Sequence, residues 1–260
     1  MILSAKKKFG QNFLVDQNIV NKILDTLQPE INDTFLEIGG GTGSITLPLQ
    51  EKVSELNVVE IDERMIKFLC TKAKNNLNLF NQDALKFDLK KITEKKHLLR
   101  VVGNLPYNIS TPLIFHLLKQ RSLIKDMHFM LQKEVVDRIV ASPGTKKYGR
   151  LSIMISIFCE KIACFNVSPN SFKPIPKIWS TFIKLNISRK NKYNIYNLNN
   201  FEYLVKFVFS MRRKTLGRSL KNIMEEKDFI SVDIDPKLRP ENLEVSSFVK
   251  LSNYLYELNK

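Results

Sequence analysis

The chain has 260 residues, of which 43% are hydrophobic and 26% are charged. This is enough chain for one or two domains with a hydrophobic core, which excludes a disulfide-stapled miniprotein, a disordered tail and a fibrous repeat. The 41 Lys and Arg residues exceed the 26 Asp and Glu residues and give a net charge of +15. An excess of this size predicts a polyanionic partner.

The apolar runs, the N-terminus and the cysteines predict a cytoplasmic protein. Leu151 to Cys159 is among the longest apolar runs, about half of the roughly 18 to 20 residues that a membrane-spanning helix needs. The lysines near the N-terminus are not followed by the apolar segment and cleavage site of a signal peptide. Cys70, Cys159 and Cys164 lack the spacing of a metal site, so we expect all three to be buried, reduced packing residues, with no metal and no membrane partner.

Strand and helix patterns alternate through the first half of the chain. TFLEI at 34–38 lies between an Asn-Asp turn signal and a glycine cluster, which predicts a buried strand followed by a helix. A second strand at 56–60 precedes Asp62, a candidate helix N-cap, and an apolar helical repeat. The rhythm continues with predicted strands at 77–80, 98–103 and 127–132 and predicted helices at 112–119 and 134–140. This alternation predicts an open parallel sheet with helices on both faces.

The pattern changes after residue 142. A basic, turn-rich loop at 142–149 and a second loop at 168–176 are long enough to suggest functional loops, and a strand is predicted at 181–187. The asparagine-rich segment 188–200 is the best linker candidate, and apolar positions recur at helical spacing beyond it. We therefore expect a catalytic domain at 1–187 and a small all-helical, RNA-binding domain at 188–260.

The glycine cluster in LEIGGGTGSIT lies between the first strand and the next helix. Ser44 stands where the dinucleotide pattern G-x-G-x-x-G requires its third glycine, and no Walker ending follows. Glu60, about 20 residues on, can accept both hydroxyls of a ribose, and Asp83 can accept an adenine amine. Alternatively, the glycines form only a tight turn and Asp83 only caps a helix.

These residues occupy three consecutive loops that follow predicted strands. Gly39, Gly41, Glu60 and Asp83 would therefore meet at the carboxyl edge of one parallel sheet, where open α/β folds bind ligands. A nucleoside site without a phosphate clamp favours S-adenosylmethionine over NAD.

Asn104, Leu105, Pro106 and Tyr107 follow the fourth predicted strand. Pro106 restrains Leu105 to an extended conformation, so that the Leu105 carbonyl and the Asn104 side-chain oxygen can point to one spot. These two acceptors match the two N–H groups of an exocyclic amine, and the Tyr107 ring can stack on the base. The tetrapeptide by itself could also be an ordinary turn.

Taken in order, these segments resemble the ribosomal RNA adenine dimethyltransferase family, most closely its small-subunit branch. The resemblance is carried by KFGQNFL at 8–14, the glycine loop, Glu60, Asp83, NLPYNISTPLIFHLL at 104–118, FKPIPK at 172–177 and MRRKTLGRSLK at 211–221. The chain departs from the family pattern at Gly40, where proline is frequent, and at Trp179, where aspartate is common. Neither departure removes a proposed ligand contact.

The resemblance implies a Rossmann-like class I methyltransferase fold with a helical C-terminal domain. It implies that S-adenosylmethionine is bound by Asn12, Leu14, Gly39, Gly41, Glu60, Asp83 and Asn104. It also implies that Tyr107 and Phe172 sandwich a flipped-out adenine. Read without the family, QNFLVD is the N-cap region of a first helix and Phe172 is a core residue.

The implied activity is N6,N6-dimethylation of two adjacent adenosines in a hairpin near the 3′ end of 16S ribosomal RNA in the 30S particle, by a monomeric enzyme of small-subunit biogenesis. RNA-backbone contacts are expected from Lys146, Lys147, Arg150, Arg212, Arg213, Lys214 and Arg218. A solvated helix face is the alternative for these residues. For the whole chain, the alternatives are a large-subunit methyltransferase of the antibiotic-resistance type and a non-catalytic nucleic-acid-binding factor.

Overall fold

The computed structural model describes residues 4–93, 98–190 and 192–258. They form two compact units, the first with residues up to 136 together with 162–187, and the second with 137–161 together with 188 onward. The chain passes between the units at the expected boundary of 187 and 188. Residues 137–161, expected in the first domain, belong instead to the second unit.

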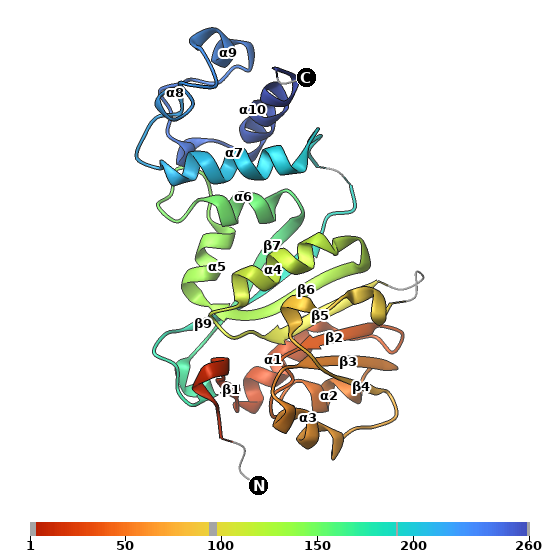
Figure 1. Ribbon diagram of the computed structural model, residues 1–260. Helices are drawn as coiled ribbons and strands as arrows, with labels where there is room; N and C mark the ends of the chain where they lie inside the picture. Colours follow the sequence, from red (N-terminus) through yellow and green to blue (C-terminus); the bar gives the residue numbers. More distant parts are fainter. Residues whose placement is uncertain (1–3, 94–97, 191, 259–260) are drawn as a thin grey trace. The chain divides into compact units, whose positions relative to one another are not determined.

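The first unit is built on a seven-stranded sheet (Figure 1). Its strands are β2 (Thr34–Ile38), β3 (Glu55–Glu60), β4 (Leu77–Asn81), β5 (Leu99–Asn104), β6 (Ile124–Gln132), β7 (Cys159–Val167) and β9 (Ser180–Ile187). They lie in the order β4-β3-β2-β5-β6-β9-β7. The five strands from β4 to β6 pair in parallel, as predicted, whereas β9 pairs antiparallel with β6. The predicted parallel sheet is thus extended beyond β6 by a strand that pairs antiparallel, because the chain enters β9 from a loop and not from a crossover helix.

Helices cover both faces of this sheet, which confirms the predicted architecture. The helices α1 (Gln17–Leu27), α2 (Thr46–Gln50) and α3 (Glu63–Cys70) bury apolar side chains in one core cluster with Phe35 and Val58. On the other face, Leu36 and Val59 lie with Leu117 of α4 (Ser110–Lys119) and with the short 3-10 helices η2 (Ala84–Lys86) and η3 (Leu89–Lys91). Adjacent residues such as Phe35 and Leu36 therefore face opposite layers, as the strand repeat requires.

Short elements lie around the sheet. They are η1 (Lys7–Phe9), η4 (Arg121–Leu123) and η5 (Pro169–Ser171), and a two-stranded ribbon in which β1 (Phe13–Leu14) pairs antiparallel with β8 (Phe172–Lys173). The pairing of β1 with β8 joins segments that are about 160 residues apart in sequence, and no local pattern predicts it.

The second unit is mainly helical. It contains the second half of α5 (Lys133–Val140), then α6 (Arg150–Ser156), α7 (Leu198–Ser210), α8 (Leu216–Ser219), α9 (Glu226–Ser231), η6 (Pro240–Asn242) and α10 (Val245–Leu258). Phe201 and Val205 of α7 are fully buried, as are Phe248 and Leu251 of α10. The buried Tyr148 donates its hydroxyl to the Leu243 carbonyl at 2.9 Å and so joins the 137–161 segment to the C-terminal helices.

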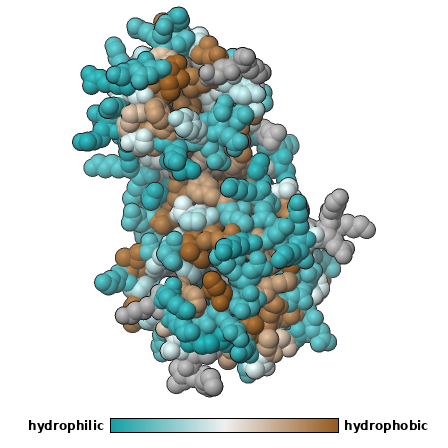
Figure 2. All heavy atoms as spheres, in the orientation of Figure 1, coloured by the Kyte–Doolittle hydropathy of each residue, from teal (hydrophilic) through white to brown (hydrophobic). Residues whose placement is uncertain are grey.

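Hydrophilic residues cover most of the face seen in Figure 2, with smaller hydrophobic areas between them. In the described parts of the chain, every helix is too short or too polar to cross a membrane. Of the three cysteines, Cys159 is buried and Cys164 half-buried, but Cys70 is exposed at the end of α3, so the expectation that all three are buried is wrong.

Candidate functional site

The carboxyl ends of four neighbouring parallel strands meet at one cavity. Gly39 follows β2, Glu60 ends β3, Asp83 follows β4 and Asn104 ends β5. The cavity has a volume of about 220 Å³. Its lining includes most of the residues predicted for the site, namely Asn12, Gly39, Gly41, Glu60, Asp83, Asn104, Leu105, Pro106 and Tyr107.

The glycine loop has a backbone that other residues rarely adopt. Gly39 and Gly41 have φ angles of 78° and 51°, in the left-handed region that favours glycine. Gly40 is required for a different reason, because a Cβ there would lie 2.6 Å from Cγ1 of Val58. The loop is therefore a tight turn, as the simpler interpretation proposed, and it also lines the cavity.

Glu60 is held by the backbone on both carboxylate oxygens. Oε2 accepts the Gly41 N–H at 3.0 Å and Oε1 accepts the Asp62 N–H at 2.9 Å. Burial of the side chain raises the pKa of Glu60, and the two backbone hydrogen bonds oppose this rise. The carboxylate is thus fixed in place at the edge of the sheet before any ligand arrives.

Asp83 fits both of its predicted roles. Its Oδ1 accepts the Leu85 N–H at 2.9 Å and caps η2, which is the helix-cap alternative. Its Oδ2 accepts no hydrogen bond from the described residues, although Asp83 lines the cavity.

The Asn104 side chain has an orientation that its neighbour determines. Nδ2 of Asn104 donates to the Asn12 carbonyl at 2.8 Å. Because a carbonyl can only accept, the amide nitrogen must face it, and Oδ1 points elsewhere. Neither this Oδ1 nor the Leu105 carbonyl accepts a hydrogen bond from the residues that the structure describes. The turn therefore carries two acceptors without partners.

Tyr107 is held through its hydroxyl. The Tyr107 oxygen lies 3.0 Å from Oγ of Ser180, which is fully buried at the start of β9. This contact fixes the hydroxyl end of the side chain and so limits displacement of the ring from the cavity wall.

Phe172 and Leu14 do not line this cavity, unlike the other predicted site residues. Pairing of β1 with β8 places Leu14 opposite Phe172, and both side chains are buried in the core cluster, with 3% and 1% of their surface exposed. This conformation therefore offers no free face of Phe172 to a base, and the simpler interpretation of Phe172 as a core residue describes it. The Leu14 carbonyl accepts a 2.5 Å hydrogen bond from Oγ of Ser44, so Ser44 ties the N-terminal segment to the glycine loop.

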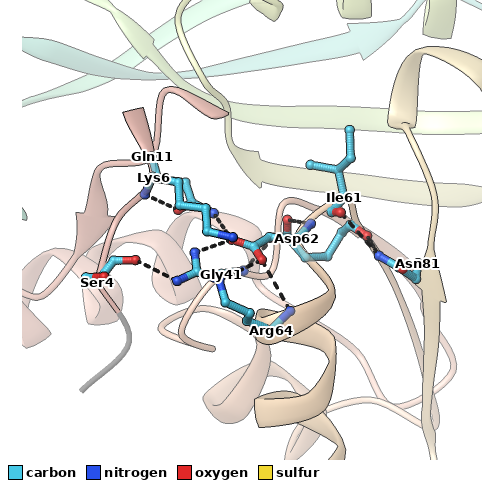
Figure 3. Close-up of polar contacts among 9 residues, drawn as sticks. Ser4, Lys6, Gln11, Gly41, Ile61, Asp62, Arg64 and Asn81 are labelled. Atoms are coloured by element: carbon cyan, nitrogen blue, oxygen red, sulfur yellow. Dashed lines mark hydrogen bonds and ion pairs between the residues drawn. The ribbon is translucent and has the colours of Figure 1, made fainter. Parts of the chain in front are cut away.

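Gln11 and Arg64 are polar residues near the site that no prediction included (Figure 3). Both contact Asp62, which caps α3 as predicted. Nε2 of Gln11 donates to Asp62 at 3.1 Å, and the Arg64 guanidinium forms an ion pair with Asp62 at 2.6 Å. The hydrogen bond from Arg64 is the largest cause that lowers the pKa of Asp62 to about 2. Because Gln11 and Asp62 are 51 residues apart, only the folded chain reveals their contact.

Comparisons with known proteins show the family of this chain. The model of the ribosomal RNA adenine dimethylase family matches residues 2–257. The chain belongs to this family. It is 45% identical to the Ribosomal RNA small subunit methyltransferase A of Buchnera aphidicola subsp. Acyrthosiphon pisum, over 96% of this chain and 93% of that protein. It is 46% identical to the protein of the same name in Coxiella burnetii, over 97% and 98% of the two chains.

Solved structures of similar proteins confirm the class I methyltransferase fold of this dimethylase family member. The crystal structure of a dimethyladenosine transferase from Plasmodium falciparum matches with a TM-score of 0.80 and 29% identity, over 95% of this chain and 97% of that one. The 23S rRNA methyltransferase ErmE matches with a TM-score of 0.70 and 21% identity, over 94% and 100%. The likeness to ErmE concerns the fold alone.

In this dimethylase family member, the basic residues predicted to contact RNA all lie in the second unit. Two of them form ion pairs, Arg212 with Glu241 at 2.5 Å and Lys147 with Asp137 at 2.7 Å. Arg212 also donates to the Lys146 carbonyl at 2.6 Å, which joins the 142–149 loop to the end of α7. Lys146 and Arg150 are exposed, as are Arg213, Lys214 and Arg218, and the last three form no ion pair within the described residues.

Proposed function

We propose that this chain transfers methyl groups from S-adenosylmethionine to N6 of two adjacent adenosines in a hairpin near the 3′ end of 16S ribosomal RNA in the 30S particle. Family membership and the relatives named Ribosomal RNA small subunit methyltransferase A support this activity and a role in small-subunit biogenesis. The observation that carries the proposal is the pair of acceptors on Asn104 and Leu105, which have no partner among the described residues and line one cavity with Glu60 and Asp83.

The cavity fits the nucleoside part of the methyl donor. The Glu60 carboxylate can accept the ribose hydroxyls, and the second oxygen of Asp83 can accept the adenine amine. A Cβ on Gly39 would meet nothing nearer than the Asn104 carbonyl at 3.9 Å, so glycine keeps this part of the cavity open. Asn12 completes the proposed donor site from the N-terminal segment, whereas Leu14, expected in this site, lies outside the cavity and binds Ser44 through its carbonyl. The donor supplies an electrophilic methyl group on a positively charged sulfur.

The proposed chemistry depends on alignment more than on proton abstraction. The lone pair of adenine N6 is delocalised into the ring, and the segment 104–107 contains no histidine or acid that could act as a base. Oδ1 of Asn104 and the Leu105 carbonyl would accept the two N6 hydrogens and localise the lone pair for attack on the methyl carbon. Alignment of reactants can lower a barrier by up to about 7 to 11 kcal/mol.

Tyr107 has the remaining catalytic role. Its ring, restrained by the hydrogen bond to Ser180, would stack on the everted adenine and stabilise the positive charge that develops on N6 before a proton leaves to solvent. Eversion costs a few kcal/mol in a duplex and less in a loop, which favours a hairpin-loop substrate. Arg213, Lys214 and Arg218 would contribute contacts to the RNA backbone.

Two alternatives differ from this proposal in substrate or in class. For a large-subunit methyltransferase, the likeness to ErmE supplies only the fold, whereas the relatives at 45% and 46% identity carry the name of the small subunit. A non-catalytic RNA-binding factor would not need a donor site, so the presence of Glu60, Asp83 and Asn104 around one cavity disfavours that alternative.

Undermethylated 30S subunits incubated with the protein and a labelled methyl donor test the proposal. We expect two dimethylated adenosines in one hairpin by mass spectrometry, no product with Asn104→Ala, and normal product with Asn21→Ala, an exposed asparagine on α1. Methylation of isolated 50S subunits alone would support the large-subunit alternative. Failure of the protein to bind the donor would support the non-catalytic one.

A further inference from the structure

The N-terminal strap, defined here as residues 4–14, runs along the wall of the proposed donor site. Residues 8–13 of the strap line the cavity. Its far end is fixed to the glycine loop by the hydrogen bond from Ser44 to the Leu14 carbonyl. Two further groups of contacts hold the strap, one through Gln11 and one through Asn12.

The first group of contacts holds Gln11 at both ends of its side-chain amide (Figure 3). Its Nε2 donates to Oδ2 of Asp62 at 3.1 Å, and its Oε1 accepts the Lys6 N–H at 2.8 Å. Arg64 pairs with Asp62 and also donates to the Ser4 carbonyl at 3.3 Å. The Asp62 side chain is 2% exposed, so its carboxylate is shielded from water, whereas the Arg64 side chain is 32% exposed.

The second group of contacts holds the catalytic turn. The carbonyl of Asn12, the residue after Gln11, accepts Nδ2 of Asn104 at 2.8 Å. Gly10 has a φ angle of 62°, and a Cβ on it would lie 3.2 Å from Oδ1 of Asn108 and 3.5 Å from Cβ of Pro106. The strap therefore packs closely on the turn that carries Asn104.

The Asn12 carbonyl is the one hydrogen-bond partner of the Asn104 side chain within the described residues. A primary amide has nearly the same shape after a rotation of 180°, which exchanges its oxygen and nitrogen. Without the Asn12 carbonyl, the Asn104 amide could rotate and present Nδ2 to the N6 hydrogens of the substrate adenine. Two hydrogen-bond donors would then face each other. Such a rotation would remove the acceptor without changing the shape of the site.

We propose that Gln11, Asp62 and Arg64 are positioning residues for methyl transfer. They hold the strap so that the Asn12 carbonyl keeps the Asn104 amide in its acceptor orientation toward the cavity. The inference rests on the proposed function, because it gives Oδ1 of Asn104 a role in transfer. Asp62 also contacts the residue proposed to bind the ribose, since its backbone N–H donates to the Glu60 carboxylate. The same residue thus touches both the donor side of the site and the strap that holds Asn104.

Gln11→Ala tests the inference, with Gln17→Ala as the matched control on the exposed start of α1. With donor and 30S subunits both saturating, we expect the single-turnover rate of Gln11→Ala to fall at least tenfold, which corresponds to about 1.4 kcal/mol in the barrier. The affinity for S-adenosylhomocysteine, measured by calorimetry, should change less than threefold. A loss of affinity equal to the loss of rate would overturn the positioning role, because the strap would then act only in binding.

A polarity swap provides the rescue. Gln11→Glu alone places two carboxylates together and should lower the rate at least as much as Gln11→Ala. Gln11→Glu combined with Asp62→Asn restores a hydrogen bond between the two side chains but not the charge with which Arg64 pairs. We therefore expect the rate to rise at least threefold above that of Gln11→Glu without reaching that of wild type. A double variant no faster than Gln11→Glu would contradict the inference.

The side-chain amide signals of Asn104 report the orientation directly. In protein with 15N-labelled asparagine, these signals are identified by their absence in Asn104→Ala. We expect the hydrogen-bonded signals of wild type to shift upfield and to exchange faster with water in Gln11→Ala, but not in Gln17→Ala. Unchanged signals in Gln11→Ala would refute the positioning role. This measurement needs neither donor nor RNA, so it remains decisive even if the wild-type protein fails to methylate 30S subunits and the proposed function is wrong.

Discussion

Glu60→Gln changes one atom at the end of β3 and affects both stability and donor binding. The two Glu60 oxygens accept the buried N–H groups of Gly41 and Asp62 at 3.0 and 2.9 Å. Glutamine keeps one oxygen, so one of these N–H groups must face an NH2 group. A buried donor without a partner costs about 1 to 3 kcal/mol. Burial disfavours the Glu60 charge, as its raised pKa shows, so removal of that charge by the substitution offsets part of this cost. We expect a net destabilisation of about 1 kcal/mol.

The effect on donor binding should be larger. In the proposed site the ribose hydroxyls donate to the Glu60 carboxylate, and hydrogen bonds to charged groups contribute about 1.5 to 3 kcal/mol. Loss of one such bond predicts an affinity for S-adenosylhomocysteine that is about 10 to 100 times weaker. Protonation of Glu60 mimics the substitution, so affinity should also fall as the pH is lowered. Because the pKa of Glu60 is raised, this loss begins at a higher pH than for an ordinary glutamate.

Calorimetric titration and urea unfolding measure the two effects. Glu63→Gln is the control, because Glu63 is exposed at the start of α3 and pairs with Lys67 away from the cavity. An affinity of Glu60→Gln within threefold of wild type, with the fold intact, would refute the assignment of Glu60 to the ribose.

Three further perturbations test the core and the basic surface. Gly40→Ala places a methyl group 2.6 Å from Cγ1 of Val58 and 2.9 Å from Cδ1 of Leu69, so we expect urea unfolding to report a loss of about 1 to 3 kcal/mol that Val58→Ala in the same chain partly reverses. His128 is fully buried, its ring nitrogens have no hydrogen-bond partner among the described residues, and burial lowers its pKa to about 4 from an ordinary 6.5. The unfolded chain therefore binds a proton that the folded chain rejects between these values, and stability should fall by up to about 3 kcal/mol as the pH drops from 6.5 to 4. The difference in unfolding free energy between wild type and His128→Leu should therefore change over this pH range. Glu37, whose pKa burial raises to about 8, titrates in both proteins and cancels in the difference. A difference that does not depend on pH would contradict the prediction. Replacement of Arg213 and Lys214 together by Gln should lower the slope of log affinity for 30S subunits against log salt by about 1.4 to 1.8 if each contacts one phosphate. Lys67→Gln, in the first unit, should leave that slope unchanged.

The parts of the fold and site that local sequence determines were predictable. The strand at 34–38 has the predicted bounds, and the glycine loop, Glu60, Asp83 and Asn104 meet because the ends of parallel strands share one edge. Asp62 caps α3 because a short acceptor side chain before a helical repeat is a local signal.

The remaining features depend on contacts between distant segments. Phe172 is buried because β8 pairs with β1, and the motif that contains it gives no sign of that pairing. The helix predicted after the glycines is only the five residues of α2, since the turn itself uses the chain up to Ile45. Residues 137–161 pack with the C-terminal helices through contacts such as Tyr148 with Leu243, which a linker pattern at 188–200 cannot indicate.

The site residues share a property that explains why their spacing alone does not reveal their geometry. Each polar group satisfies one hydrogen-bonding requirement of the fold and keeps another position for a ligand. One oxygen of Asp83 caps η2 while the other has no partner among the described residues, and the nitrogen of Asn104 binds the strap while its oxygen stays unpaired. Because the fold already fixes these groups, little ordering remains to oppose binding, which is the condition for a preorganised site. Substitutions that keep shape but exchange a donor for an acceptor should therefore damage folding and transfer together. The polarity swap of Gln11 and Asp62 exchanges both members of one pair and should restore part of both, because Arg64 still lacks its charged partner.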